Sequence, residues 1–500
     1  MTELIPQINW LVLGPHVLIL ITAFIVMFVD LAIFKRCDYK NLFATNLVSL
    51  LGLAVTLGYL LSVWGRAGDP ASMTTLSGSV VLDRFSVFFD IIFVVAGIVT
   101  VLFSWYYGRL EGINHGEYYT LLLFAIYGMM CMTSTNNLLM LFLGLELMSI
   151  AVYVLTGQIR GQGKSAEAAL KYFLLGAFST GFLLFGIVGI FGATGSLDIT
   201  QIGLPENATK LETTLALGGV GLLLVGFGFK TASVPFHMWT PDAYDGAPTT
   251  VTGFMAVGVK AAAFAAFLRV FGQALFAINV PWTKILWLIA ILTMTYGNIV
   301  ALVQTNIKRM LAYSSIAHAG YILVGLVALF RSKQFGAESI AFYLLVYAFM
   351  NLGAFGLISY LAKRGDTEYS INSYAGLASR HPALAAALAI FMFSLAGIPP
   401  FGGFVAKFYV FSAGVKAGLY GLVIIGVLNS MLSVYYYIRV VYLMYMKEAD
   451  ESAYVAAVPS PNFASSLGVL ITAAFTIVFG LLPQLFATFA RTSIENIFKF

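Results

Sequence analysis

The stretch that decides the fold is GLLLVGFGFKTASVPF, residues 221–236, in which a long apolar run meets Pro235. A proline inside a helix removes a backbone donor and breaks the helix. A second stretch, LAGIPPF at residues 395–401, repeats this pattern with Pro399 and Pro400, and Pro400 follows Pro235 by 165 residues. Broken helices at bilayer depth survive only where protein or a wet cavity surrounds them. The two stretches therefore predict a membrane transporter with helix breaks at corresponding places.

The composition of the whole chain agrees with a membrane protein. Of its 500 residues, 60% are hydrophobic and 10% are charged, and the mean hydropathy is +0.91. Soluble globular domains carry about 25% charged residues, so a soluble, disordered or coiled-coil chain is excluded. Long unbroken apolar runs exclude a transmembrane β-barrel, whose strands alternate in polarity. The net charge is +5 with basic residues spread along the chain, which indicates no nucleic-acid surface.

The apolar runs predict an all-α polytopic membrane protein. Since a span needs about 20 apolar residues, we expect about fourteen transmembrane helices and no separate soluble domain. They are expected near residues 12–34, 43–64, 82–106, 117–134, 137–157, 167–193, 213–236, 249–272, 283–304, 309–330, 338–361, 382–413, 418–445 and 464–489.

The two broken spans predict an internal repeat. Spans four to eight and nine to thirteen each contain one proline break, and five is odd, so the second unit must be inverted in the membrane relative to the first. We therefore expect helices one to three in residues 1–116, the first five-helix repeat in 117–281 and the inverted second repeat in 282–446. A loop and helix fourteen then occupy residues 447–500.

The loops set the expected orientation. Lys35, Arg36 and Lys40 follow the first span, and the small excess of Lys and Arg on that side favours both termini outside, in the periplasm of a bacterium. The first apolar run lacks the basic region and cleavage site of a signal peptide. Cys37 and Cys131 are too few for a zinc or iron–sulfur site, and we expect two unpaired thiols.

Five ionisable residues are expected at bilayer depth: Glu146, Lys230, Lys260, His318 and Lys407. Each buried charge costs roughly 2.5 kcal/mol or more, so such residues are functional by default. A Glu–Lys pair of variable separation acts as a protonation switch, because closing it holds the lysine proton and opening it releases that proton. Glu146 and Lys230 are the natural pair, and Lys260, His318 and Lys407 would continue a proton path.

Structural roles are the alternative for these residues. Buried ion pairs could fix helix packing, and His318 could be a hydrogen-bonded core histidine. Lys171 lies about one turn inside its span, where it either anchors at the interface or joins the path. Asp30 and Asp90 are expected to be structural, and His237 is a candidate for a channel mouth.

Four motifs carry a family resemblance that covers nearly the whole chain. They are LGLEL (143–147), LKYFLLGAFS (170–179), KTASVPFHMWTPDAYDGAP (230–248) and LAGIPPFGGF (395–404). The chain resembles the antiporter-like membrane subunits of respiratory complex I, the proton-translocating NADH:quinone oxidoreductase. Within them it is most similar to the subunit N branch, called subunit 2 in mitochondria.

The resemblance implies fourteen helices with inverted repeats and two broken helices. It implies that Glu146 and Lys230 form the switching pair. It places Lys260 at the centre of a hydrated axis, with His318 onward from it and Lys407 at the exit side. Sister subunits carry Glu at the position of Lys407, so lysine there, without a long C-terminal amphipathic helix, favours subunit N.

The resemblance also implies the partners. Such subunits hold no cofactor or metal and perform no redox chemistry, while NADH, FMN, iron–sulfur clusters and quinone belong to partner subunits. The expected partners are a neighbouring antiporter-like subunit, small membrane subunits, the lipid bilayer, protons and water, in a bacterial inner membrane. The alternatives are an Mrp-type cation/proton antiporter subunit, the equivalent subunit of a related hydrogenase or photosynthetic complex, and a purely structural scaffold.

Overall fold

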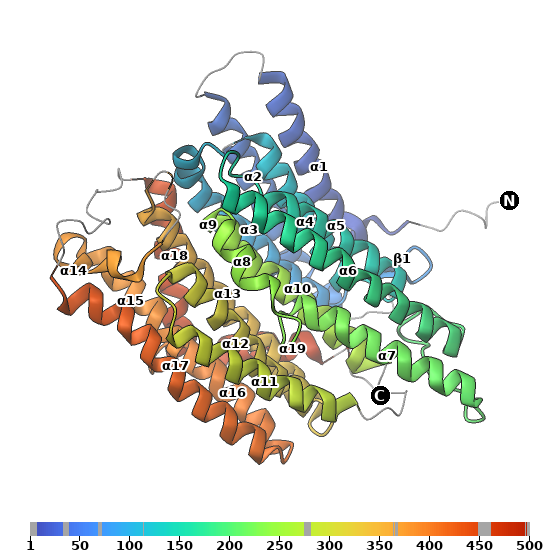
Figure 1. The fold of residues 1–500 in the computed structure, drawn as a ribbon. Helices are drawn as coiled ribbons and strands as arrows, with labels where there is room; N and C mark the ends of the chain where they lie inside the picture. The colour runs from blue at the N-terminus through green and yellow to red at the C-terminus, as the bar shows by residue number, and fades with distance from the viewer. Residues whose placement is uncertain are drawn as a thin grey trace.

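The protein is a bundle of long helices that lie side by side (Figure 1). The computed structural model describes residues 8–33, 40–68, 73–113, 115–274, 282–363, 365, 369–448, 462–495 and 497. The α-helices are α1 (Trp10–Ile33), α2 (Lys40–Val63), α3 (Arg84–Glu111), α4 (Gly116–Thr133), α5 (Leu138–Thr156), α6 (Gly163–Thr194), α7 (Lys210–Lys230), α8 (Trp239–Gly246), α9 (Thr249–Phe254), α10 (Lys260–Arg269), α11 (Trp282–Leu302), α12 (Ile307–Ala328), α13 (Lys333–Leu361), α14 (Leu377–Arg380), α15 (Pro382–Ala396), α16 (Gly402–Lys416), α17 (Tyr420–Met446), α18 (Phe463–Leu481) and α19 (Pro483–Ile494).

Short elements complete the chain. Two π-helical segments, η3 (Met255–Val259) and η4 (Val270–Ala274), flank α10, and two 3₁₀ turns, η2 (Arg66–Gly68) and η5 (Ile371–Tyr374), lie in loops. Strands β1 (Thr74–Thr75) and β2 (Val80–Val81) pair antiparallel before α3. This hairpin was not predicted, because two-residue strands leave no periodic pattern in a sequence.

The apolar runs form membrane-length helices, as predicted. Within the described ranges, twelve helices are long and apolar enough to cross a membrane. The prediction of an all-α polytopic membrane protein is therefore confirmed, while the total of fourteen spans stays a prediction. The twelfth predicted span, 382–413, is divided into α15 and α16, each of 15 residues.

The helices form an inner group and an outer group. The most apolar stretches of the segment Thr249–Gln273 and of helix α13 are wholly buried, and those of α12 and α3 are almost so. The outer helices expose large apolar side chains instead, for example Phe178 and Phe185 on α6. In Figure 1 the blue-to-green and yellow-to-red halves of the chain meet along α8, α10, α12 and α13. An apolar outer surface around a central group of helices is the arrangement expected of a chain surrounded by lipid.

The first predicted break lies at Pro235. Helix α7 ends at Lys230, and α8 begins at Trp239. The freed backbone groups find side-chain partners: the Val234 N–H donates to Thr293 Oγ1 on α11 at 3.0 Å, and Trp239 Nε1–H donates to the Phe229 carbonyl at 3.0 Å. The break is tolerated because neighbouring helices satisfy its backbone.

The second predicted break lies at Pro399 and Pro400. Helix α15 ends at Ala396, and Gly397 turns the chain with φ +84°, a left-handed conformation that glycine adopts without strain. Helix α16 then begins at Gly402. The Val234–Pro235 and Pro399–Pro400 peptide bonds are both cis. Both predicted helix breaks are thus present where the prolines stand.

The predicted length of the last span was wrong. A single helix was expected over residues 464–489, but α18 ends at Leu481 and a separate α19 begins at Pro483. Proline lacks the backbone N–H and restricts the residue before it, so it starts a new helix more readily than it continues one. Cys131 is a free thiol. The predictions for Cys37, Lys35 and Arg36 fall outside the described residues.

Candidate functional site

Lys230 is buried at the C-terminal end of α7. Only 2% of the residue is exposed, and its ammonium donates to Ser149 Oγ at 2.7 Å and to Tyr153 OH at 3.2 Å, both on α5. The carbonyl end of a helix carries partial negative charge, which stabilises a cation there. The α7 break therefore presents a lysine amine to two neutral hydroxyls.

Glu146 lies on the same face of α5 as these hydroxyls, three residues before Ser149 and seven before Tyr153. Its carboxylate does not contact Lys230: among the described residues, Glu146 Oε1 is buried and has no hydrogen-bond partner. The fold thus brings Lys230 of α7 to the face of α5 that carries Glu146. There the two hydroxyls, and not the carboxylate, bind the lysine ammonium. This geometry corresponds to the open arrangement of a Glu–Lys pair.

Lys260 is buried at the start of α10, directly after the π-helical turn η3. Its ammonium donates to both the carbonyl and the Oγ of Ser315 on α12. The same Oγ accepts a hydrogen bond from Tyr347 OH on α13 at 2.9 Å. Single π-turns inside α-helices are frequent at functional sites, because they redirect a side chain. Ser315 therefore connects the predicted central lysine to a tyrosine on another helix.

His318 lies one turn along α12 from Ser314. Its Nδ1 is 2.6 Å from Tyr343 OH, and its Nε2 is 3.2 Å from Tyr437 OH. Tyr437 OH also hydrogen-bonds Ser314 Oγ. The imidazole thus contacts hydroxyls on both sides, and its ring lies 5.2 Å from that of Tyr347, measured between centroids. These partners satisfy a core histidine, and hydroxyls that both donate and accept also suit a proton relay.

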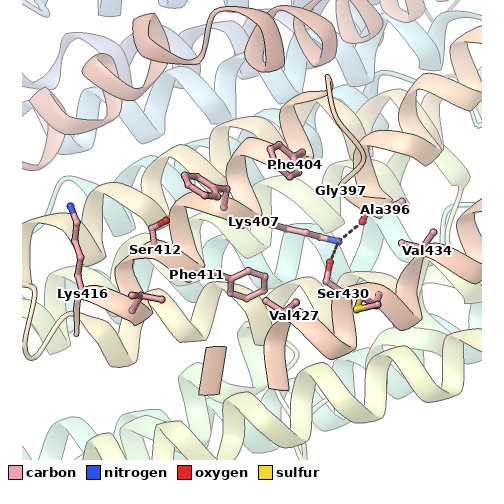
Figure 2. Close-up of a pocket in the computed structure, with 13 residues that line it drawn as sticks. Ala396, Gly397, Phe404, Lys407, Phe411, Ser412, Lys416, Val427, Ser430 and Val434 are labelled. Carbon is pink, nitrogen blue, oxygen red and sulfur yellow. Dashed lines mark hydrogen bonds between the residues drawn. The ribbon is translucent and has the colours of Figure 1, made fainter. Parts of the chain in front are cut away.

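Lys407 lies on α16, just after the second break (Figure 2). Its ammonium donates to the Ala396 carbonyl at 2.9 Å, to Ser430 Oγ at 3.0 Å and to Ser433 Oγ at 3.5 Å. The ammonium also lies 5.2 Å from the centre of the Tyr321 ring. Ala396 is the last residue of α15, so this amine binds at the carbonyl end of a broken helix, whereas the Lys230 amine binds hydroxyls of α5.

A cavity of about 680 Å³ lies beside Lys407, between α16 and α17 (Figure 2). Phe404, Phe408, Phe411 and Met431 give it mostly apolar walls, and Lys407 also lines it. The described lining includes no carboxylate. Because Phe404, Phe408 and Met431 are exposed, Lys407 lies close to the outer surface of the bundle, whereas Lys260 lies on a buried segment.

These residues form what we call the polar axis: Lys230, Lys260, His318 and Lys407 with the serines and tyrosines that they contact. Each lysine amine lies 5.2–5.6 Å from the centre of a tyrosine ring. The described residues include no direct side-chain hydrogen bond between the Lys230 group and the Lys260 group, or between the Lys260 group and the His318 group. Tyrosines 153, 321, 343, 347 and 437 were not predicted as members. Tyr343 and Tyr347 stand four residues apart on α13, a spacing that could have indicated a shared helix face.

Lys171 does not join the polar axis. Its ammonium pairs with Glu167 at 2.7 Å and with Asp242 at 2.9 Å, and its side chain is 46% exposed. Asp242 also binds Arg309 at 3.0 Å, so the cluster ties α6, α8 and α12 together at one end of the bundle. This geometry favours the interfacial-anchor interpretation of Lys171.

Two further groups lie apart from the axis. The His237 ring lies in the first break against Tyr296, with 4.6 Å between ring centres, and its Nδ1 is buried without a hydrogen-bond partner among the described residues. Asp90 on α3 is fully buried and accepts a hydrogen bond from Thr133 at 2.8 Å. The described residues include no group of three or more His, Cys, Asp or Glu side chains placed to hold a metal ion.

Comparison with known proteins gives the family. Residues 135–433 match the family model described as NADH:quinone oxidoreductase/Mrp antiporter, TM. The chain is 45% identical over 496 residues to NADH-quinone oxidoreductase subunit N of Trichlorobacter lovleyi, covering 99% of both chains.

Solved structures agree. A chain of respiratory complex I from Thermus thermophilus, solved with bound aureothin, is 33% identical with a TM-score of 0.78, covering 95% of this chain and 98% of that one. A chain of the Mrp complex from Dietzia sp. shares the fold, with 21% identity, a TM-score of 0.82 and coverage of 97% and 98%. The chain therefore belongs to the NADH:quinone oxidoreductase/Mrp antiporter membrane family, in its subunit N branch.

Proposed function

We propose that the chain is the non-redox, proton-translocating subunit N of the membrane arm of an NADH:quinone oxidoreductase. One observation carries the proposal: the polar axis runs through a chain that is 45% identical over its whole length to a named subunit N. Buried ionisable groups in membrane helices mark proton pathways. The polar axis supplies the proton path, and electron transfer from NADH to quinone takes place in partner subunits.

The roles within the axis follow from the contacts. Glu146 and Lys230 form the switch at the entry, with Ser149 and Tyr153 holding the open arrangement. Lys260 and His318 pass protons through the serine and tyrosine hydroxyls at the centre, and Lys407 releases them at the far break. Each group both accepts and donates protons, as a relay requires.

The assembly follows from the same family. The chain works in a multisubunit membrane arm beside another antiporter-like subunit and small membrane subunits, while NADH, FMN, iron–sulfur clusters and quinone are bound elsewhere in the complex. Residues 117–281 and 282–446 act as two inverted repeats, one around each broken helix. The complex lies in a bacterial inner membrane, with both termini of this chain in the periplasm. The accessibility of epitopes attached to the termini, measured in sealed vesicles, tests this orientation.

The decisive experiment compares Lys230→Ala with Lys230→Arg in membrane vesicles. Arginine keeps the positive charge but does not release its proton, so both variants should lose NADH-driven proton uptake through this subunit. Loss of one acid–base group slows proton transfer by about 10²–10⁴-fold. If the chain were only a structural scaffold, Lys230→Arg would leave NADH-driven proton uptake unchanged.

The matched control is Lys164→Arg, the same exchange at a half-exposed ion pair with Asp245, which should leave proton uptake normal. Assembly is checked in each vesicle preparation by subunit composition. Full pumping by Lys230→Arg would refute the relay. Subunits of a small cation antiporter co-purifying in place of quinone-reductase subunits would support the Mrp alternative instead.

A further inference from the structure

A second cavity, away from the polar axis, lies between α1, α4 and the loop that joins α5 to α6. Its volume is about 540 Å³. Met27, Leu31, Leu121 and Val154 supply its apolar wall, and the polar lining consists of Asp30, Glu117, Thr120, Gln158 and Arg160. Nothing in the proposed proton path uses these residues.

The charged residues of this cavity lie at one level. Asp30 stands in the last turn of α1, Glu117 in the first turn of α4, and Arg160 in the loop just after α5. Apolar spans of this length end at the boundary between hydrocarbon and water. The cavity therefore opens where phospholipid headgroups lie.

The cavity holds charges of both signs. Arg160 pairs with Glu117 at 3.0 Å, and both side chains are largely exposed. Asp30 has no ion-pair or hydrogen-bond partner among the described residues. It lies against the start of α4, where a Cβ on Gly116 would approach its Oδ2 to 2.7 Å, so glycine makes room for this carboxylate. The cavity thus offers one guanidinium and two carboxylates.

An apolar track continues from the cavity along the bundle. On α1, Phe24, Phe28 and Leu31 follow helical spacing and are exposed, and on α5 Ile150 and Val154 are exposed as well. The track extends about 10 Å along α1, from Leu31 to Phe24, and begins beside the charged end of the cavity, so it can hold the first part of an acyl chain.

We propose that this cavity binds a zwitterionic phospholipid with a primary ammonium headgroup, that is, a phosphatidylethanolamine. Arg160 holds the phosphate, Asp30 and Glu117 hold the ammonium, and an acyl chain lies along the track of α1. An ammonium donates three hydrogen bonds and so suits two carboxylates. A choline headgroup has no N–H to donate, and an anionic glycerol headgroup would leave Asp30 without a cation.

The test uses the assembled complex, purified and delipidated in detergent. A phosphatidylethanolamine with a photoreactive acyl chain is cross-linked, and the labelled peptides are mapped. Label should appear on α1, α4 and α5, and unlabelled phosphatidylethanolamine should compete about fivefold better than phosphatidylcholine or phosphatidylglycerol. Fivefold corresponds to the ~1 kcal/mol of a partly exposed charge pair.

Two variants and one control complete the test. Asp30→Asn and Arg160→Gln should each reduce labelling of the cavity about fivefold, whereas Glu206→Gln, in the exposed loop before α7, should not change it. Equal competition by the three lipids, or labelling that neither variant changes, would overturn the proposal. A photoreactive amino acid replacing Leu121 that cross-links a neighbouring polypeptide instead of lipid would overturn it too.

Discussion

The three lysine amines of the polar axis bind neutral acceptors. Lys230 donates to two hydroxyls, Lys260 to a serine carbonyl and hydroxyl, and Lys407 to a carbonyl and two serine hydroxyls. A buried ammonium needs such partners, because leaving it without hydrogen bonds in an apolar interior is costly. Neutral partners also permit proton release, since no buried carboxylate is left unpaired when the amine becomes neutral.

Substitutions of Glu146 test the switch hypothesis most directly. Glu146→Ala removes the carboxylate and should impair NADH-driven proton uptake strongly, while Glu146→Asp keeps a carboxylate one methylene shorter and should impair it less. Proton uptake by sealed vesicles, normalised to NADH oxidation, measures both. Glu448→Ala, at an exposed site after α17, is the control and should behave like the unmodified protein. Full activity of Glu146→Ala would rule out the pair.

The two helix breaks share a physical role. In each, a buried lysine is associated with a helix end inside the bundle: Lys230 is the last residue of α7, and the Lys407 amine binds the carbonyl of Ala396, the last residue of α15. The partial negative charge of a helix C-terminus and its free carbonyls favour a cation. Proline, by ending the helix, creates that environment at a depth where no water is available to provide it.

The hydrogen bond from the Val234 N–H to Thr293 Oγ1 at the first break is expected to stabilise the folded subunit. Thr293→Val leaves the Val234 N–H without its acceptor, which should destabilise the break by about 1–3 kcal/mol. Thr293→Ser keeps the oxygen and should cost less. Thermal unfolding of the purified complex, followed by loss of this subunit, measures the difference. Equal midpoints for the two variants would show that the hydrogen bond contributes nothing to the break.

At the scale of the whole molecule, a buried ion pair that was not predicted from the sequence joins two distant parts of the chain. Arg269, at the end of α10, donates to both carboxylate oxygens of Asp83 at 2.9 Å, and Asp83 also caps α3 by accepting from the Ser86 N–H. Arg269 is 1% exposed and also contacts Asn136. The pair therefore joins the first three helices to the first predicted repeat.

Removing one partner of this pair should be costly. Arg269→Met leaves Asp83 as an unpaired buried charge and should destabilise the subunit by about 3–5 kcal/mol. Adding Asp83→Asn removes that charge while keeping the helix cap, so the double variant should be more stable than the single one. Thermal stability of the assembled complex measures both, and a double variant less stable than Arg269→Met would contradict this explanation.

Much of the fold could be read from the sequence. Apolar runs of span length predict membrane helices because every backbone group must be satisfied within its own helix, and the prolines at 235, 399 and 400 mark the breaks because they cannot donate. The error at Pro483 has a related cause: an apolar run continues through it, although the helix does not. Burial of Lys230, Lys260 and Lys407 was likewise foreseeable from their positions within such runs.

The sequence by itself determined that this chain spans a membrane, where its helices break and which ionisable side chains lie deep within it. Only the tertiary structure decided their partners: Ser149 and Tyr153 for Lys230, and Ser315 for Lys260. It also decided the contacts of Arg269 with Asp83, 186 residues away in sequence. The reason is physical, because hydropathy and proline act locally along the chain, whereas a hydrogen-bond partner on another helix depends on how the helices pack.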